Sequence, residues 1–427
     1  MSEWRKGLNF SRAKYKQLDE FTFLPHVRSD SSTSIPRNIV EKFSDIELKN
    51  PVALVEIQQK DREFFRIKKL KKQGNSLTIS LKPCYETGHK IKIIDIKDER
   101  LLLSREKEKT KRKINISSIL PHYTNRGIKS TPIYLFKQGK KLVAGGYYKK
   151  DLVINGNISL NETSLSAIGL YFCEGGKFNA TFTNSWPSAI NIILKFLEGN
   201  FYIDRKNIHA AIYCNKSLTG KKQNLEEFWT HKTGINLFYE KLHTSINSTS
   251  PCGTLELHFS SKILKEILIS IIDNLFNYKF DKSHLQRGVL SGDGSPIRQT
   301  KYNLTHHIAT DKKPESLTFI KNIFSGFTLK VIPTQPKITV YTTWKQNKNL
   351  LLNDSYRFNL LNRVRFANRF LNLPKTVSTK DKDLEKFRNT DYNNLLDDLL
   401  QHYNDLNQFN LSDESLMEKI KNDHSLC

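Results

Sequence analysis

Apolar residues recur at every second position within the segment 61–115. The alternating positions are Leu77, Ile79, Leu81, Ile91 and Ile93. A period of two is typical of strands that bury one face, and the Gly-containing stretches around these runs indicate turns. The pattern predicts a small β-rich module here. Residues 1–60 contain Ser, Thr and Pro residues and no strong hydrophobic period. We expect them to form an N-terminal extension.

Near the C-terminus, apolar residues recur at helical spacing. The positions are Tyr392, Leu395, Leu396, Leu399, Leu400, Tyr403 and Leu406, with Asp and Asn on the opposite side. From Thr376 to Cys427 there are eleven acidic and six basic residues, which gives a net charge of −5. The pattern predicts an acidic helical tail. We expect it to dock on the body of the protein; docking on a partner and shielding of a basic surface are the alternatives.

The rest of the chain is strongly basic. The 427 residues contain 68 Lys and Arg against 43 Asp and Glu, a net charge of +25, and the 25 Phe and 16 Tyr suffice for hydrophobic cores. A basic field of this size points first to a nucleic-acid partner, because a polyanion is its usual complement. An AT-rich genome that favours Lys and Asn codons would produce a similar balance.

Several other protein classes fit the sequence poorly. No apolar run approaches the roughly 18 residues that span a membrane, and the N-terminal residues lack an apolar signal core. The five Cys are scattered without a CxxC pair, so we expect neither a disulfide framework nor a zinc ribbon. No P-loop motif is present. We therefore expect a cytoplasmic protein without membrane association.

Two segments of the chain match one another. SLSAIGLYFCEGGKF and HLQRGVLSGDGSPI each place a Gly in an apolar stretch, an acid five residues later and a further Gly directly after the acid. These positions are Gly169, Glu174 and Gly175 in the first segment, and Gly288, Asp293 and Gly294 in the second. The two acids are 119 residues apart, a spacing that fits a duplicated domain.

The sequence that follows each segment matches as well. TNSWPSAINIILKFLEGNF begins at Thr183, and TDKKPESLTFIKNIFSGF begins at Thr310. Each has Asn or Asp after the Thr, then Pro and a helical apolar pattern. The pattern predicts two corresponding helices with Asn184 and Asp311 as their N-caps.

The paired segments resemble the LAGLIDADG motif of homing endonucleases. AIGLYFCEG and QRGVLSGDG align with it, with Glu174 as a common variant of the motif's Asp and Ser291 as a mild departure. The resemblance covers about residues 130–375. It implies an α+β fold with two pseudo-symmetric αββαββα repeats in one chain and a β-ribbon saddle for DNA. It also implies staggered cleavage of both strands at a long target site.

The residue types of this motif have a physical rationale of their own. Gly169 and Gly288 would allow two helices to cross closely, so that both helix ends meet. Glu174 and Asp293 would then combine their charges with the negative ends of both helices, which favours a divalent cation such as Mg²⁺. A metal-bound water is a better nucleophile toward phosphate. The alternative is that both acids are ordinary surface residues at the ends of core helices.

Polar residues alternate in the stretches that follow the two motifs, where strands are expected. The candidate DNA-contacting positions are Lys177, Asn179, Thr181 and Thr183 after the first motif, and Gln299, Lys301, Asn303, Thr305 and His307 after the second. Side chains of one parity share a face and would reach base edges in the major groove. Alternatively, they form the solvent face of an antiparallel sheet. We interpret His306 and His307 as ordinary strand residues rather than metal ligands.

The LAGLIDADG resemblance also implies basic residues near the cleavage centre, often a Lys on a later strand. Lys262 and Lys345 are the candidate positions, although neither lies in a distinctive motif. A second resemblance concerns QGNSLTISL, which is similar to the swapped-hairpin DNA-binding domain of the AbrB and MazE type. The following KPCYETGHKI departs from that family's helix and Gly-Asp turn, and a plain β-rich module is the alternative.

These patterns and resemblances divide the chain into six expected segments. They are 1–60 (extension), 61–115 (small β module), 116–160 (connecting hairpin region), 161–276 (first LAGLIDADG repeat), 277–375 (second repeat) and 376–427 (acidic helical tail). We expect a Mg²⁺-dependent, site-specific DNA endonuclease, free-standing or intron-encoded and not an intein. A monomer is expected through the two-repeat core, with a dimer possible through the N-terminal module. The alternatives are a non-catalytic DNA-binding regulator on the same scaffold and a maturase that binds intron RNA.

Overall fold

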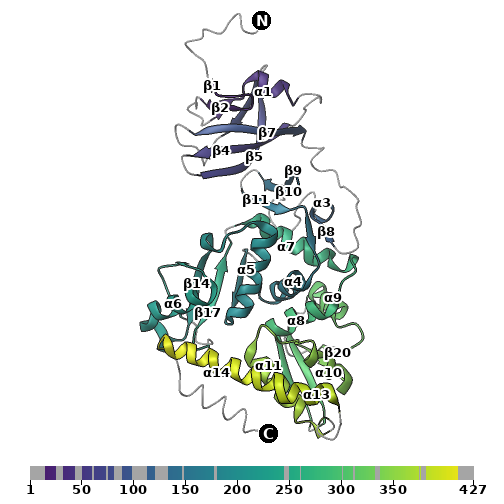
Figure 1. The fold of residues 1–427 in the computed structure, drawn as a ribbon. Helices are drawn as coiled ribbons and strands as arrows, with labels where there is room; N and C mark the ends of the chain where they lie inside the picture. Colours follow the sequence, from purple (N-terminus) through teal and green to yellow (C-terminus); the bar gives the residue numbers. More distant parts are fainter. Residues whose placement is uncertain are drawn as a thin grey trace, which may run out of the picture. The chain divides into compact units, whose positions relative to one another are not determined.

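The computed structural model describes seventeen stretches of the chain. They are residues 15–25, 32–43, 51–59, 62–73, 76–80, 89–98, 113–120, 133–146, 149–176, 180–244, 250–259, 261–300, 302–310, 313–331, 337–374, 376 and 381–411. The fold is mixed α+β, as the sequence predicts (Figure 1). The chain divides into two compact units. The first contains Met1–Thr110, Asn115–Ile158 and Ser261–Ile271, and the second contains Lys111–Ile114, Ser159–Ser260 and Ile272–Cys427.

A seven-stranded antiparallel sheet forms most of the first unit. Its elements are β1 (Tyr15–Gln17), β2 (Thr22–Pro25), β3 (Ser32–Ser34), the helix α1 (Arg37–Glu41), β4 (Pro51–Gln59), β5 (Arg62–Gln73), β6 (Ser76–Ser80) and β7 (Lys90–Asp98). The strand order is β1-β2-β7-β4-β5-β6-β3. One face packs around Ile39 of α1, and the core there includes Phe23, Val55 and Ile79.

The sheet joins two segments that the sequence places apart. β4 precedes the expected boundary at residue 60, yet it pairs with β5 and β7 on the other side of that boundary. Residues 51–57 are buried without alternation, because both faces of the central strand β4 are covered. A strand buried on both faces lacks the period of two, so the sequence pattern missed it and assigned it to an extension.

A three-stranded sheet covers the other face of β4 and β5. It consists of β9 (Tyr134–Gln138), β10 (Lys141–Gly146) and β11 (Lys149–Asn155). Tyr134, Phe136 and Val143 pack against Val52, Leu54 and Ile67 in one cluster. The short elements β8 (Lys113–Asn115), α3 (Ile116–Ile119) and β12 (Asn157–Ser159) also occur in this part of the chain.

The second unit consists of two halves whose elements follow a similar order. The first half contains α4 (Glu162–Glu174), β13 (Thr181–Asn184), α5 (Pro187–Phe201), η3 (Arg205–Asn207), β14 (His209–Cys214), η4 (Lys216–Lys221), α6 (Lys222–Thr233), β15 (Leu237–Phe238), β16 (His243–Thr244) and β17 (Thr254–His258). The second half contains α8 (Lys282–Gly292), β18 (Gly294–Arg298), β19 (Leu304–Ala309), α9 (Pro314–Ile323), β20 (Thr328–Val331), β21 (Lys337–Tyr341), α10 (Trp344–Leu352) and α11 (Leu360–Leu371). Helix α7 (Lys262–Asn274), most of which groups with the first unit, and η5 (Leu275–Asn277) separate them in sequence.

The two halves also share the order of their main strands. In the first-half sheet the order is β13-β17-β14, and β15 and β16 pair with β14 in parallel. In the second-half sheet the order is β18-β19-β21-β20. Thus β13, β17 and β14 occupy the places of β19, β21 and β20, with antiparallel pairing in both halves. A single bridge between Gly175 and Phe182 takes the place of β18 in the first half.

The expected helix caps lie two residues away from the observed ones. Helix α5 has Trp186 as its N-cap, and the side chain of Asn184 instead accepts a hydrogen bond from the Trp186 amide at 2.9 Å. Helix α9 has Lys313 as its N-cap, and Asp311 lies outside the described residues. Pro187 and Pro314 occupy the first helical turn, where Pro needs no amide hydrogen, and this displaces each cap.

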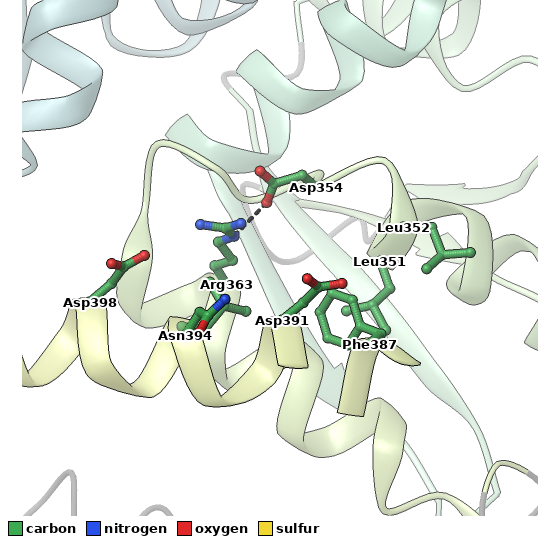
Figure 2. A pocket seen from close by; sticks show the side chains of 9 residues that line it. Leu351, Leu352, Asp354, Arg363, Phe387, Asp391, Asn394 and Asp398 are labelled. Atoms are coloured by element: carbon green, nitrogen blue, oxygen red, sulfur yellow. Dashed lines mark ion pairs between the residues drawn. The ribbon is translucent and has the colours of Figure 1, made fainter. Parts of the chain in front are cut away.

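The C-terminal helical prediction is confirmed over the described part. The segment forms α13 (Lys382–Lys386), η6 (Phe387–Asp391) and α14 (Tyr392–Gln408) and docks on both halves of the second unit (Figure 1). A cavity of about 250 Å³ remains where it meets the second half (Figure 2). The lining residues are Leu351, Leu352, Asp354, Arg363, Phe387, Asp391, Asn394, Leu395 and Asp398. Arg363 pairs with Asp354 at 2.5 Å at one side of it.

Candidate active site

Helices α4 and α8 cross at two glycines. A Cβ atom added to Gly169 would lie 2.6 Å from the Leu285 carbonyl oxygen, and one added to Gly288 would lie 2.9 Å from the Gly169 Cα. Real Cβ atoms do not approach other atoms so closely, so only glycine allows the two main chains to lie in direct contact. The crossing places the two matching sequence segments side by side at their centres.

Each crossing helix ends at a candidate catalytic acid. Glu174 is the last residue of α4, and Asp293 is the C-cap of α8, where its amide donates to the Val289 carbonyl at 3.1 Å. The two ends are close, because a Cβ at Gly292 would lie 2.8 Å from the Cys173 Cβ and 3.6 Å from the Glu174 Cγ. After the two acids the backbone becomes extended: Gly175 bridges to Phe182, and β18 begins at Gly294. The Asp293 carbonyl accepts a hydrogen bond from the Ala309 amide at 3.3 Å.

The two carboxylates share an unfavourable electrostatic environment. Burial, and after it the nearby charge of Asp293, raise the pKa of Glu174 to about 7. Burial together with Asp293 and Glu174 also raises the pKa of the adjacent Cys173 thiol. Both acids lie at helix C-termini, whose partial negative charge opposes their ionisation. Among the described residues, Glu174 has no ion pair or hydrogen bond through its carboxylate.

This donor set fits a hard divalent cation. Two half-buried carboxylates at adjoining helix ends, with no positive partner on Glu174 and a raised pKa for that group, leave a negative charge that a cation would neutralise. Within the described ranges, no group of three or more His, Cys, Asp and Glu side chains is placed to hold a metal ion. A cation between Glu174 and Asp293 would therefore complete its shell with water and substrate oxygens, which Mg²⁺ accepts readily.

The second-half sheet presents part of the polar set expected from the sequence. Thr305 and His307 lie on one face of β19, paired with Tyr341 and Thr339 of β21, but Thr305 is buried and only His307 is partly exposed. Gln299 and Asn303 are exposed, but they form the turn between β18 and β19, where the Gln299 amide donates to the Asn303 carbonyl at 3.0 Å. The expected run of one parity is thus interrupted by a hairpin turn.

The first-half sheet presents a comparable face. Thr181 and Thr183 of β13 pair with His258 and Glu256 of β17 and share one face of the sheet, on which Thr181 is buried and the other three are half-buried. Three of the expected DNA-contacting residues, Lys177, Asn179 and Lys301, lie outside the described residues.

Neither candidate lysine lies on a strand. Lys262 is the first residue of α7 and belongs to the first unit, whereas Lys345 lies in the first turn of α10. Both are exposed. The resemblance led us to expect a Lys on a late strand, and the described strands that follow Lys262 carry other lysines at positions 330 and 337.

His306 is a core residue of the second half. Its Nδ1 lies 2.7 Å from the Tyr356 hydroxyl and its Nε2 lies 2.9 Å from Asn347 Oδ1. Burial lowers its pKa to about 4, so it is neutral near pH 7. Its interpretation as an ordinary strand residue agrees with these contacts.

Sequence reasoning missed an ion pair between a buried Arg and an exposed Glu beside the helix crossing. Arg287 on α8 pairs with Glu162 on α4 and donates through Nη2 to the Asn353 carbonyl at 2.8 Å. Arg287 lies in the QRGVLSGDG segment at a position that the motif does not specify, so the sequence gives no signal for its role. The pair connects the same two helices, through the residue directly before Gly288 and the first residue of α4.

None of the helices among the described residues is both long and apolar enough to cross a membrane. Comparison of the chain with models of known protein families gives no match, and comparison with curated protein sequences gives none either.

Proposed function

We propose that the chain is a metal-dependent, site-specific DNA endonuclease of the LAGLIDADG type. The observation that carries the proposal is the approach of Glu174 and Asp293 at the ends of two helices that cross at glycines. In this interpretation the two halves of the second unit are pseudo-symmetric αββαββα repeats. Their shared order of main strands supports that view.

The chain's own residues would prepare the site for phosphodiester hydrolysis. Gly169 and Gly288 set the spacing of the carboxylates, which would hold Mg²⁺ between the two repeats. When bound, the cation supplies an activated water and offsets charge on the phosphate and the leaving oxygen. The polar faces of the two sheets would bind the target on either side and orient one phosphodiester of each strand toward the acids.

Cleavage of a random-site duplex library, with and without Mg²⁺, tests the function. We expect double-strand breaks at one long sequence, and only with the metal. A protein that binds one sequence but cuts none under any metal condition would instead be a regulator. The N-terminal sheet gives that second function its support, because the described centre of the QGNSLTISL resemblance, Ser76–Ser80, forms its strand β6.

Substitution of the two acids tests the site itself. We expect Glu174→Gln and Asp293→Asn each to lower the cleavage rate by at least about two orders of magnitude, because each removes a charged metal ligand. DNA binding without metal should persist or tighten, since a carboxylate that repels phosphate is gone. Glu315→Gln, at an exposed position on α9, is the matched control and should cleave like wild type. Asp293→Asn cleaving both strands at the wild-type rate would refute this assignment.

A further inference from the structure

One face of the first-half sheet carries a cluster of rings around a single carboxylate. We name the set His209, Tyr213, Tyr239, His243, Glu256 and His258 the histidine face. His209 and His258 are directly paired across β14 and β17, and Glu256 is the residue two positions before His258. Leu255 and Leu257, of the opposite parity, are fully buried on the helix side. The histidine face is therefore the open side of this sheet.

The members of the histidine face contact one another. The rings of Tyr213 and His243 stack with centroids 4.8 Å apart, and Tyr239 meets His258 edge-on at 5.1 Å. Nε2 of His258 lies 3.1 Å from Oε1 of Glu256, without the alignment of a hydrogen bond. These contacts place the imidazole of His258 beside the carboxylate of Glu256, with His209 and His243 next to His258.

The two sheets differ in the kind of charge they present. The strands β18–β21 of the second half carry Arg298, Lys330 and Lys337 and contain no Asp or Glu. The strands β13–β17 of the first half contain no Lys or Arg, and Glu256 is their one acid. The second sheet is therefore positive at every physiological pH. The first sheet becomes positive only when its histidines bind protons.

A polyanion bound at this face would favour the protonated form of its histidines. With neutral histidines, Glu256 is the sole formal charge of the histidine face and repels phosphate. Protonation of His209, His243 and His258 would outweigh that carboxylate and provide donors to phosphate oxygens. Because binding favours the protonated form, the bound complex takes up protons that the free protein lacks.

We propose that the histidine face is a proton-dependent contact for DNA, which takes up protons on binding and binds more tightly as the pH falls. The proposal rests on the proposed DNA-binding function and concerns the regulation of that surface. In the free protein, burial lowers the pKa of His258, and the neighbouring His243 and His209 lower it further against the opposite effect of Glu256.

The titratable groups around His258 come from three strands and one loop. They are Glu256 from β17, His209 and Tyr213 from β14, His243 from β16 and Tyr239 after β15. The facing residues of β13, Thr181 and Thr183, do not titrate. Glu256 also raises the pKa of Tyr213, after burial, so this hydroxyl remains protonated near pH 7.

The test measures binding of a fluorescent duplex of mixed sequence by anisotropy at pH 6 and pH 8, at one salt concentration, with EDTA to prevent cleavage. Net uptake of one proton changes affinity about tenfold per pH unit where it titrates. We expect wild type to bind at least about tenfold more tightly at pH 6. Calorimetry in two buffers of different ionisation enthalpy should show proton uptake on binding.

Three variants and a control assign the effect. His209→Gln, His243→Gln and His258→Gln combined should lose most of the pH dependence, while Glu256→Gln should strengthen binding at pH 8. His231→Gln, an exposed position on α6, is the matched control and should behave like wild type. Thermal melts of each variant check folding. The inference is overturned if the folded triple variant keeps the full pH dependence. It is also overturned if a double variant that retains only His209 keeps it. Either result leaves the proposed DNA-binding function untouched. No duplex binding at either pH contradicts the proposed function.

Discussion

At the scale of single residues, Asp151 is a buried carboxyl whose two oxygens have different surroundings. Oδ2 accepts a hydrogen bond of 2.5 Å from the Ile67 amide of β5, whereas Oδ1 is buried without a hydrogen-bond partner. Burial raises the pKa of Asp151 to about 8, against the opposing effects of Arg66, the Ile67 amide and Lys68. Asp151 is therefore protonated near pH 7 when the first unit is folded.

The raised pKa fixes the sign of a pH effect on stability. A folded-state pKa above the unfolded value of about 3.9 means that stability is present at low pH and is lost as the pH rises toward 8. We expect the protection of the Ile67 amide against hydrogen exchange, corrected for intrinsic rates, to fall between pH 5 and pH 8. Asp151→Asn keeps the acceptor without the charge and should be insensitive to pH in this range.

Asp19 provides a control of opposite sign. Its carboxylate accepts from the Phe21 amide, and this hydrogen bond lowers its pKa. Asp19→Asn should therefore differ from wild type at neutral pH, and the difference should disappear as the pH falls and the wild-type carboxylate is protonated. If Asp151→Asn and wild type lose Ile67 protection in parallel from pH 5 to pH 8, another group is responsible.

At the scale of elements, the crossing of α4 and α8 depends on the absence of side chains. A Cβ at Gly288 would overlap the Ser166 carbonyl oxygen and the Gly169 main chain, which is backbone and cannot move aside. The helices would have to separate, and the carboxylates at their ends would separate with them. Packing at one residue is thus coupled to the geometry of the candidate site.

We expect Gly288→Ala to lower the free energy of unfolding of the second unit by about 1–3 kcal/mol. Gly199→Ala is the matched control: this glycine also lies in a helix, α5, but an added Cβ meets nothing within 4 Å. It should stabilise by about 0.5–1 kcal/mol. Denaturant titration followed by Trp fluorescence reports on this unit through Trp186, Trp229 and Trp344. Equal stability of the two variants would contradict the close crossing.

Sequence patterns predicted the elements that repeat or alternate. The Gly and acid spacing located both crossing helices, and the apolar spacing from Tyr392 to Leu406 located α14. The patterns failed where burial or a turn removes the period. β4 is buried on both faces, and the polar alternation from Gln299 to Asn303 is a hairpin turn rather than a strand face. The ring cluster around Glu256 had no local signal, because its members come from separate strands.

At the scale of the whole chain, the acidic C-terminal segment connects the two halves of the second unit. On the first half, the His402 ring packs near Trp186 and Phe228, and Lys232 pairs with Asp405. On the second half, Lys348 of α10 pairs with Asp381 and Asp383, at 2.7 and 3.0 Å. Apolar residues of α14 face the body and Asp397 is exposed, whereas Asp405 is half-buried in its ion pair with Lys232. The acidic helix therefore docks on this basic protein through apolar packing and a charge pair.

Docking of α14 should weaken at mildly acid pH. Burial and the charge of Lys232, against the opposing effect of Asp405, lower the pKa of His402 to about 4, so the folded state keeps this ring neutral. A base with a lowered folded-state pKa costs stability as the pH falls below about 6.5. We expect amide protection of α14 to decrease from pH 7 to pH 5. The Asp405 ion pair persists in this range, because hydrogen bonds from Lys232 and Gln401 lower the pKa of Asp405 against the effect of burial.

His402→Phe keeps the ring packing but cannot bind a proton, so its α14 should remain protected at pH 5. Hydrogen exchange resolved by peptide measures this directly, with α5 as an internal reference. Equal loss of α14 protection in His402→Phe and wild type would assign the transition to a different group.

The position of α14 in the chain has a consequence for biosynthesis. Both halves precede it, so the ribosome completes them before it makes the helix that fastens them together. Domains generally fold in the order of their synthesis. Each half must therefore reach its own fold without this support, and the connection between them closes as a late event of maturation. A ribosome that stalls before Lys382 would leave two folded halves without their fastening helix.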